Sequence, residues 1–116
     1  MEYLRKQSAQ EVTILGRKMT IEKPSFGENR KIINQSMKFD METKQPEIDA
    51  SLLGTLRAIS IVKDWDLTDE SGKKLPITLD TFDNVLDPEF ASMLVDELGR
   101  IEEAGFTHVS EDEKKQ

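Results

Sequence analysis

Four acidic side chains follow one another closely in the middle of the chain: Asp64, Asp66, Asp69 and Glu70. Carboxylates are the ligands that Ca²⁺ prefers, and an EF-hand loop needs glycine at its sixth position and glutamate at its twelfth. Counting from Asp64, these positions hold Asp69 and Leu75. The pattern therefore excludes an EF-hand. We expect the acids to oppose Lys73 and Lys74 of the same turn instead.

Other catalytic or ligand-binding patterns are also missing from the sequence. His108 is the single histidine and there is no cysteine, so a zinc site has too few ligands. A serine nucleophile needs a neighbouring base, and no G-x-S-x-G, G-x-x-x-x-G-K-[ST] or G-x-G-x-x-G motif occurs. We expect a protein that is not an enzyme and that has no cofactor and no metal.

Composition narrows the class of partner. The 116 residues carry a net charge of −7, which repels polyphosphate, so nucleic acid is not an expected partner. The amino terminus lacks the apolar core of a signal peptide, and no apolar run approaches the roughly 20 residues that span a bilayer. We expect a soluble cytoplasmic protein that does not enter membranes.

The first half of the chain predicts a hairpin, a helix and an extended arm. Apolar and polar residues alternate on either side of Leu15-Gly16-Arg17, which predicts two strands over residues 11–22. Ser25 and Glu28 have the spacing of a capping box, so a helix should begin there and run to about Lys38. Beyond it the apolar period changes to two, which predicts a short extended arm through residues 43–46.

A second helix is expected over residues 50–64, with Leu52, Leu56 and Ile59 on its main core face. Ile61 and Trp65 would project from the opposite side of that helix. Two interpretations follow. The helix is covered on both sides by the core, or Ile61 and Trp65 belong to a surface that binds a partner.

The last third of the chain has clear start and stop signals. Residues 68–74 form a polar turn, and Thr78 can cap a short helix that ends near Val85. Asp87 and Pro88 begin a final helix, which should end at Gly105. The apolar stripe of this helix contains Phe90, Leu94, Leu98 and Ile101, with Met93 at one edge. Glu97 interrupts the stripe, either as its solvated end or as a carboxylate that meets an Arg or Lys of a partner.

Together these elements predict one α+β domain: an N-terminal β-hairpin followed by three to four helices, mainly helical. We assign residues 1–10 to an N-terminal extension, residues 11–106 to the domain and residues 107–116 to a disordered charged tail.

The order of features resembles the small tail assembly chaperones and related tail-morphogenesis proteins of long-tailed bacteriophages and prophages. The resemblance covers about residues 11–104, and its segments are VTILGRKMTIEKPSFGE, SMKFDMETKQPEID, KDWDLTDESGKKLPIT and LDPEFASMLVDELGRI. Its most characteristic part is Trp65-Asp66-Leu67, followed by Asp69, Gly72, Leu75-Pro76-Ile77-Thr78 and the helix start at Leu86-Asp87-Pro88. These are turn and core residues and carry no catalytic signature.

The resemblance implies a non-enzymatic assembly factor in the host cytoplasm. Such a factor binds the long, largely helical tape-measure protein, keeps it soluble and helps to recruit tail-tube subunits. An apolar groove rimmed by charge would suit this task. The candidate contacts are Ile61, Trp65, Phe90 and Met93, with Glu97 as a charged contact; ordinary core packing is the alternative for Phe90 and Met93. A homo-oligomer is compatible with this role.

Two other functions compete with the chaperone. A head-tail connector or tail-terminator subunit would form a ring, and it would need two complementary heterologous faces and a stable oligomer. A host-directed inhibitor that mimics DNA would need one continuous acidic face. Lys and Arg are interspersed with the acids through most of this chain, which disfavours the mimic.

Overall fold

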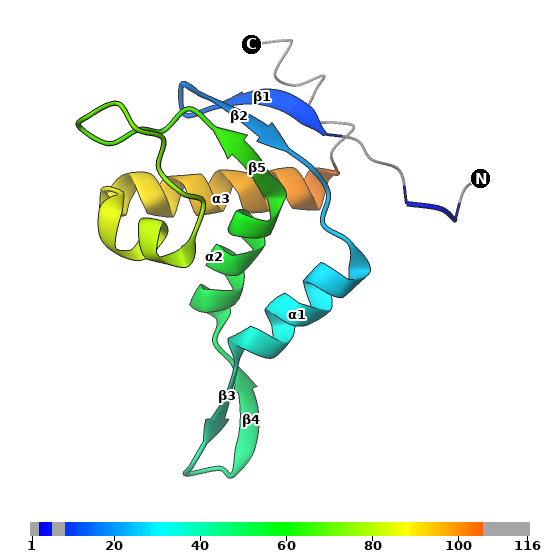
Figure 1. Ribbon diagram of the computed structural model, residues 1–116. Helices are drawn as coiled ribbons and strands as arrows, with labels where there is room; N and C mark the ends of the chain where they lie inside the picture. Colours follow the sequence, from blue (N-terminus) through cyan, green and yellow to red (C-terminus); the bar gives the residue numbers. More distant parts are fainter. Residues whose placement is uncertain (1–2, 6–8, 106–116) are drawn as a thin grey trace.

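The computed structural model describes residues 3–5 and 9–105, and the remaining residues at both ends lie outside the described part, including the tail expected at 107–116. The fold is α+β, as predicted (Figure 1). Of the described residues, 47% are helical and 24% lie in strands, so "mainly helical" fits only loosely. The elements in chain order are β1 (Gln10–Ile14), β2 (Arg17–Ile21), α1 (Phe26–Ser36), β3 (Met37–Asp40), β4 (Gln45–Ile48), α2 (Ala50–Ile61), β5 (Val62–Trp65), a π-helical turn (Thr81–Val85) and α3 (Pro88–Ala104).

The predicted N-terminal hairpin is confirmed. β1 and β2 pair antiparallel, with Val12 opposite Met19 and Ile14 opposite Arg17. Leu15 and Gly16 both have positive φ, at 52° and 78°, which is the geometry of a tight two-residue hairpin turn. β5 adds to the free edge of β2, giving a three-stranded sheet in the order β1-β2-β5.

The capping box at the start of α1 is also confirmed. The Ser25 hydroxyl accepts from the Glu28 amide at 3.1 Å, and the Glu28 carboxylate accepts from the Ser25 amide at 3.0 Å. Two amides that the helix leaves without partners are thereby satisfied. The hydrogen bond from the Ser25 backbone amide to the Glu28 carboxylate is the largest cause of the lowered pKa of Glu28. α1 ends at Ser36, two residues before the expected Lys38.

The extended arm after α1 is a complete hairpin. β3 and β4 form a separate two-stranded sheet, joined by a turn over residues 41–44. Asp40 holds this turn, because its carboxylate accepts from the Glu42 amide at 2.8 Å. We call β3, β4 and their turn the arm. The arm projects away from the three-stranded sheet at the junction of α1 and α2 (Figure 1).

The expected helix over residues 50–64 is wrong at its end. α2 stops at Ile61, and Val62–Trp65 is strand β5, paired with β2. The backbone groups of β5 find their hydrogen-bond partners on β2, so they do not need a longer helix. The pairing begins at the end of α2, where the Glu22 amide donates to the Ile61 carbonyl at 2.9 Å. The tryptophan therefore lies on a strand opposite Met19.

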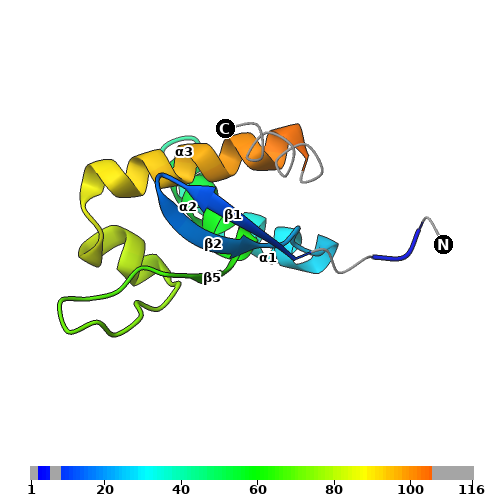
Figure 2. The same ribbon diagram turned by 90° about the horizontal axis from the view of Figure 1, so that it is seen from above.

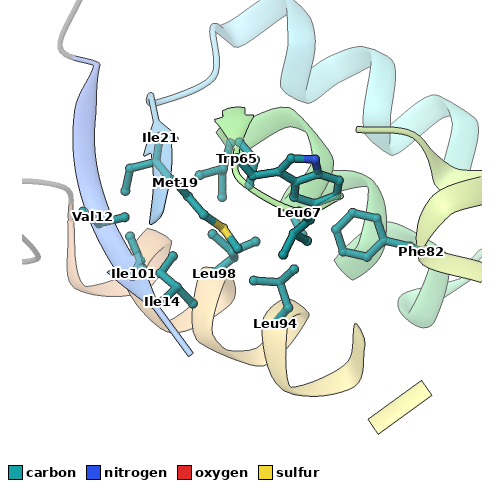
Figure 3. Close-up of a cluster of buried hydrophobic side chains, with 13 residues drawn as sticks. Val12, Ile14, Met19, Ile21, Trp65, Leu67, Phe82, Leu94, Leu98 and Ile101 are labelled. Atoms are coloured by element: carbon teal, nitrogen blue, oxygen red, sulfur yellow. The ribbon is translucent and has the colours of Figure 1, made fainter. Parts of the chain in front are cut away.

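The core lies between the inner face of the three-stranded sheet and the helices α2 and α3. Figure 2 shows α3 running beside the β1–β2 hairpin, and Figure 3 shows how the side chains converge. The predicted stripe of α3 is confirmed, with Leu94, Leu98 and Ile101 fully buried. From α2 the buried residues are Ala58 and Ile61, whereas the predicted face with Leu52, Leu56 and Ile59 is only partly buried.

Trp65 joins three parts of the chain within this core. Its side chain is 2% exposed and its ring packs on Phe82, with centroids 5.8 Å apart and planes tilted by 34°. Its indole N–H donates to the Leu75 carbonyl at 2.8 Å. A buried indole thus has both an aromatic neighbour and an acceptor, the combination that makes tryptophan stabilising inside a protein.

We predict that Trp65→Ala lowers the free energy of unfolding by about 3–5 kcal/mol, because it opens a cavity and leaves the Leu75 carbonyl without its donor. Urea denaturation measures this loss. Met93→Ala is the control, and since Met93 is half exposed we expect a loss under about 1 kcal/mol. Equal losses for the two variants would contradict the central place of Trp65 in the core.

Candidate functional site: an apolar groove beside the tryptophan

An open groove of about 870 Å³ lies between the loop that follows β5 and the segment that leads into α3. We call it the loop groove. The loop is the projecting segment between β5 and the π-helical turn in Figure 1. The groove is lined by Arg17, Leu67, Thr68, Asp69, Glu70, Ser71, Leu75, Val85, Leu86, Asp87 and Phe90.

One wall of the loop groove is a turn organised by Asp69. Its carboxylate accepts from the Ser71 hydroxyl at 2.6 Å, from the Ser71 amide at 2.9 Å and from the Lys73 amide at 3.0 Å. Gly72 takes a φ of 88°, which glycine adopts without strain. These bonds lower the pKa of Asp69, and the Ser71 hydroxyl is the largest cause. The base of the loop is closed by the Leu75 amide on the Leu67 carbonyl at 2.9 Å.

The other wall comes from the π-helical turn and the start of α3. Thr78 precedes the helical residues 79–80 that lead into this turn, and its hydroxyl accepts from the Thr81 amide at 3.3 Å, as the capping prediction expects. The wider π-helical winding brings the Leu86 amide to the Thr81 carbonyl at 2.9 Å. Asp87 is the predicted N-cap of α3 and accepts from the Phe90 amide at 3.1 Å. Phe90 is thereby fixed at the first turn of α3, at the edge of the groove.

The groove has an apolar floor and a charged rim. Leu75, Leu86 and Phe90 are partly buried against the core, and Val85 remains 52% exposed. The rim carries the charged side chains of Arg17, Asp69, Glu70 and Asp87. Such a surface can accept apolar side chains of another molecule while the rim stays in water. Within residues 3–5 and 9–105, no group of acids and histidine is arranged to hold a metal ion.

The structure separates the five predicted contact residues. Phe90 lines the loop groove. Met93 is half exposed one turn further along α3, and Glu97 lies one turn beyond it, where it pairs with Arg100 at 3.0 Å. By helical spacing these three residues share one side of α3.

The prediction of Ile61 and Trp65 as an exposed partner surface is wrong. Ile61 is fully buried and Trp65 nearly so. The reason is the end of α2: since the chain becomes a strand at Val62, Trp65 points into the core instead of continuing an outer helix face. Ile61 and Trp65 are both covered by the core, but the interpretation of one helix covered on both sides is also wrong, because Trp65 lies on β5. Trp65 still acts on the groove indirectly, through its bond to Leu75.

Sequence reasoning missed the apolar residues of the groove that lie outside helices. Leu67, Leu75 and Val85 have no helical or strand period that would place them together. The available signal was weaker. Leu67 and Leu75 lie on either side of a polar turn, and Val85 lies just before the start of α3.

Two of the acidic residues that follow α2 form ion pairs with basic side chains. Asp64 pairs with Lys74 at 2.8 Å, as the sequence predicts, and this hydrogen bond is the largest cause of the lowered pKa of Asp64. Asp66 pairs with Arg17 at 3.2 Å. Both ion pairs are exposed and contribute little to stability. Asp64, Asp66 and Lys74 line a hollow on the outer face of the sheet, together with Glu11, Thr13, Lys18 and Thr20.

Comparison with protein-family models, with curated proteins and with solved structures finds no match for this chain. No helix in the described ranges has the length and apolar character that crossing a membrane requires.

We predict that the loop wall of the groove loosens in acid. Above pH 3.8, the usual pKa of the group, the Asp69 carboxylate is charged whether the loop is folded or open, and its hydrogen bonds stabilise the folded loop. This stabilisation is lost as the pH falls through the lower pKa that Asp69 has in the folded loop. NMR should show the Ser71 and Lys73 amides shifting together with a midpoint below 3.8. The same titration should vanish in Asp69→Asn. A midpoint at or above 3.8 would contradict the assignment.

Proposed function

We propose that this protein is a non-enzymatic tail assembly chaperone that holds an apolar helical segment of a phage tape-measure protein in its loop groove. The observation that carries the proposal is the groove itself, an apolar floor ending at Phe90 with charged residues around it. The resemblance over residues 11–104 supplies the class of protein and the identity of the partner.

The chemistry of the groove suits an amphipathic helix. A helix presents apolar side chains at i, i+3 or i+4 and i+7, and a groove with an apolar floor takes them one after another. Leu75, Leu86 and Phe90 would receive these side chains, and Val85 would close over them from the rim. Removing apolar surface of the partner from water is the driving force, so the task needs no covalent step.

The side of α3 beside the groove extends this surface. Met93 follows Phe90 by one turn, and a flexible thioether adapts to partner side chains of different shapes. Glu97 is already paired with Arg100, and a basic residue of the partner would compete for the same carboxylate. Recruitment of tail-tube subunits in the host cytoplasm belongs to the same proposal and rests on the resemblance.

We predict that Val85→Glu weakens tape-measure binding at least about tenfold, because the substitution places a charge at an apolar contact. Val85 is 52% exposed, so the fold should tolerate the change. The binding partner is the very long helical protein expected from a gene beside the one for this chain. Co-purification and titration calorimetry of its segments measure the affinity.

Ile33→Glu is the matched control. Ile33 is an exposed apolar residue of α1 that does not line the loop groove, so this variant should bind as the parent protein does. Equal affinity for Val85→Glu and the parent would contradict the groove as the site. Absence of a gene for a long helical protein beside this one would contradict the chaperone.

A further inference from the structure

The arm has one apolar face and one polar face. In the register of β3 and β4, Met37 lies opposite Ile48 and Phe39 lies opposite Pro46, all on one side, whereas Lys38 lies opposite Glu47 on the other. The apolar face is open to solvent: Phe39 is 57% exposed, and Met41, which continues the alternation, is 78% exposed. A two-stranded hairpin with an uncovered apolar face is at best marginally stable in water.

The hydrogen bonds of the arm show which backbone groups point toward its outer edges. The Asp49 amide donates to the Ser36 carbonyl at 2.7 Å, just before the pair Met37 and Ile48. Hydrogen-bonded and non-hydrogen-bonded pairs alternate along an antiparallel ladder, so Phe39 and Pro46 form a non-hydrogen-bonded pair. Their backbone groups therefore point away from each other, toward the two outer edges of the arm.

Proline makes these edges unequal. Pro46 has no N–H, so the outer edge of β4 lacks a donor at its centre, which is a common way to block pairing with another strand. The outer edge of β3 has no proline, and Phe39 presents both its N–H and its carbonyl there. The Met37 amide on this edge already binds the Asn34 carbonyl, so Phe39 is the residue of β3 that offers both groups to a further strand.

The sequence of β3 is complementary to itself when it is turned around Phe39. If a second β3 runs antiparallel with the two Phe39 residues opposite each other, Lys38 of each copy faces Asp40 of the other. Met37 of each copy then faces Met41 of the other. Opposite charges meet on the polar face, and aromatic and thioether side chains meet on the apolar face; both kinds of cross-strand pair are favourable.

We propose that this edge binds a second copy of the chain, so that two arms join through β3 into a four-stranded sheet. The pairing is isologous, with the same surface used twice, and therefore closes as a dimer. Each copy would donate its Phe39 amide to the Phe39 carbonyl of the other. The apolar side chains of β3 gain neighbours across the new strand pair. This dimer is independent of the tape-measure proposal, since it forms without any other protein.

A cysteine cross-link tests the register directly, because the natural chain contains no cysteine. Opposed residues of a hydrogen-bonded pair have Cα atoms about 5.5 Å apart, within the range of a disulfide. Phe39→Cys should therefore give a covalent dimer under mild oxidation. Glu47→Cys is the matched control, since it is exposed on the same arm but lies on β4, outside the new strand pair, and it should stay monomeric.

Two results would overturn the cross-linking prediction. If both variants cross-link at the same rate, the disulfides report random collisions of the arms. If neither cross-links, the two Phe39 residues do not meet.

A charge swap in an otherwise native arm gives the second test. Lys38→Glu combined with Glu47→Lys keeps an opposite-charge pair within the arm but places a carboxylate opposite Asp40 of the second copy. Sedimentation equilibrium should show a dimer for the parent protein and a dissociation constant at least tenfold higher for the double variant, with a smaller difference in high salt. Circular dichroism should be unchanged.

Three outcomes of the sedimentation test would contradict the arm-to-arm dimer. The parent protein is a monomer at hundreds of micromolar, or it forms a closed ring of six or more copies, or the double variant dimerises as tightly as the parent.

Discussion

The contacts of Trp65 hold the structure together at the point where the loop groove begins. The ring packs on Phe82 of the segment that leads into α3, and the indole N–H binds the Leu75 carbonyl in the loop after β5. Since Trp65 itself is anchored in the sheet opposite Met19, one side chain fixes both walls of the loop groove to the core. The groove therefore depends on a residue that is itself almost fully buried.

This arrangement separates stability from recognition. The sheet, α2 and α3 bury the residues that stabilise the fold, whereas Val85, Phe90 and Met93 remain accessible beside the tryptophan. A protein that binds apolar helices needs this separation, because its exposed apolar side chains must be held in place by a core that is already stable. The arm is a second accessible surface, separate from the groove, and the two would let one protein bind its own copy and a partner at the same time.

Local signals in the sequence predicted much of the fold. The Leu15-Gly16 turn, the Ser25 capping box and the Asp87-Pro88 helix start each depend on neighbours in the chain, and all three are confirmed. The end of α2 could not be predicted in this way, because Val62–Trp65 becomes a strand only through pairing with the distant β2. Of the predicted site, Phe90 lies in the groove, but the groove needs Leu75 and Val85, which tertiary packing alone brings together.

Hydrogen exchange of the chain, alone and mixed with a segment of the proposed tape-measure partner, tests the central claim most directly. Binding in the loop groove should slow exchange of the amides in residues 67–75 and 85–93, while the amides of β1 keep their free-state rates. Protection confined to the β1–β2 hairpin, or no change in residues 67–75 and 85–93 at saturating partner, would contradict the account.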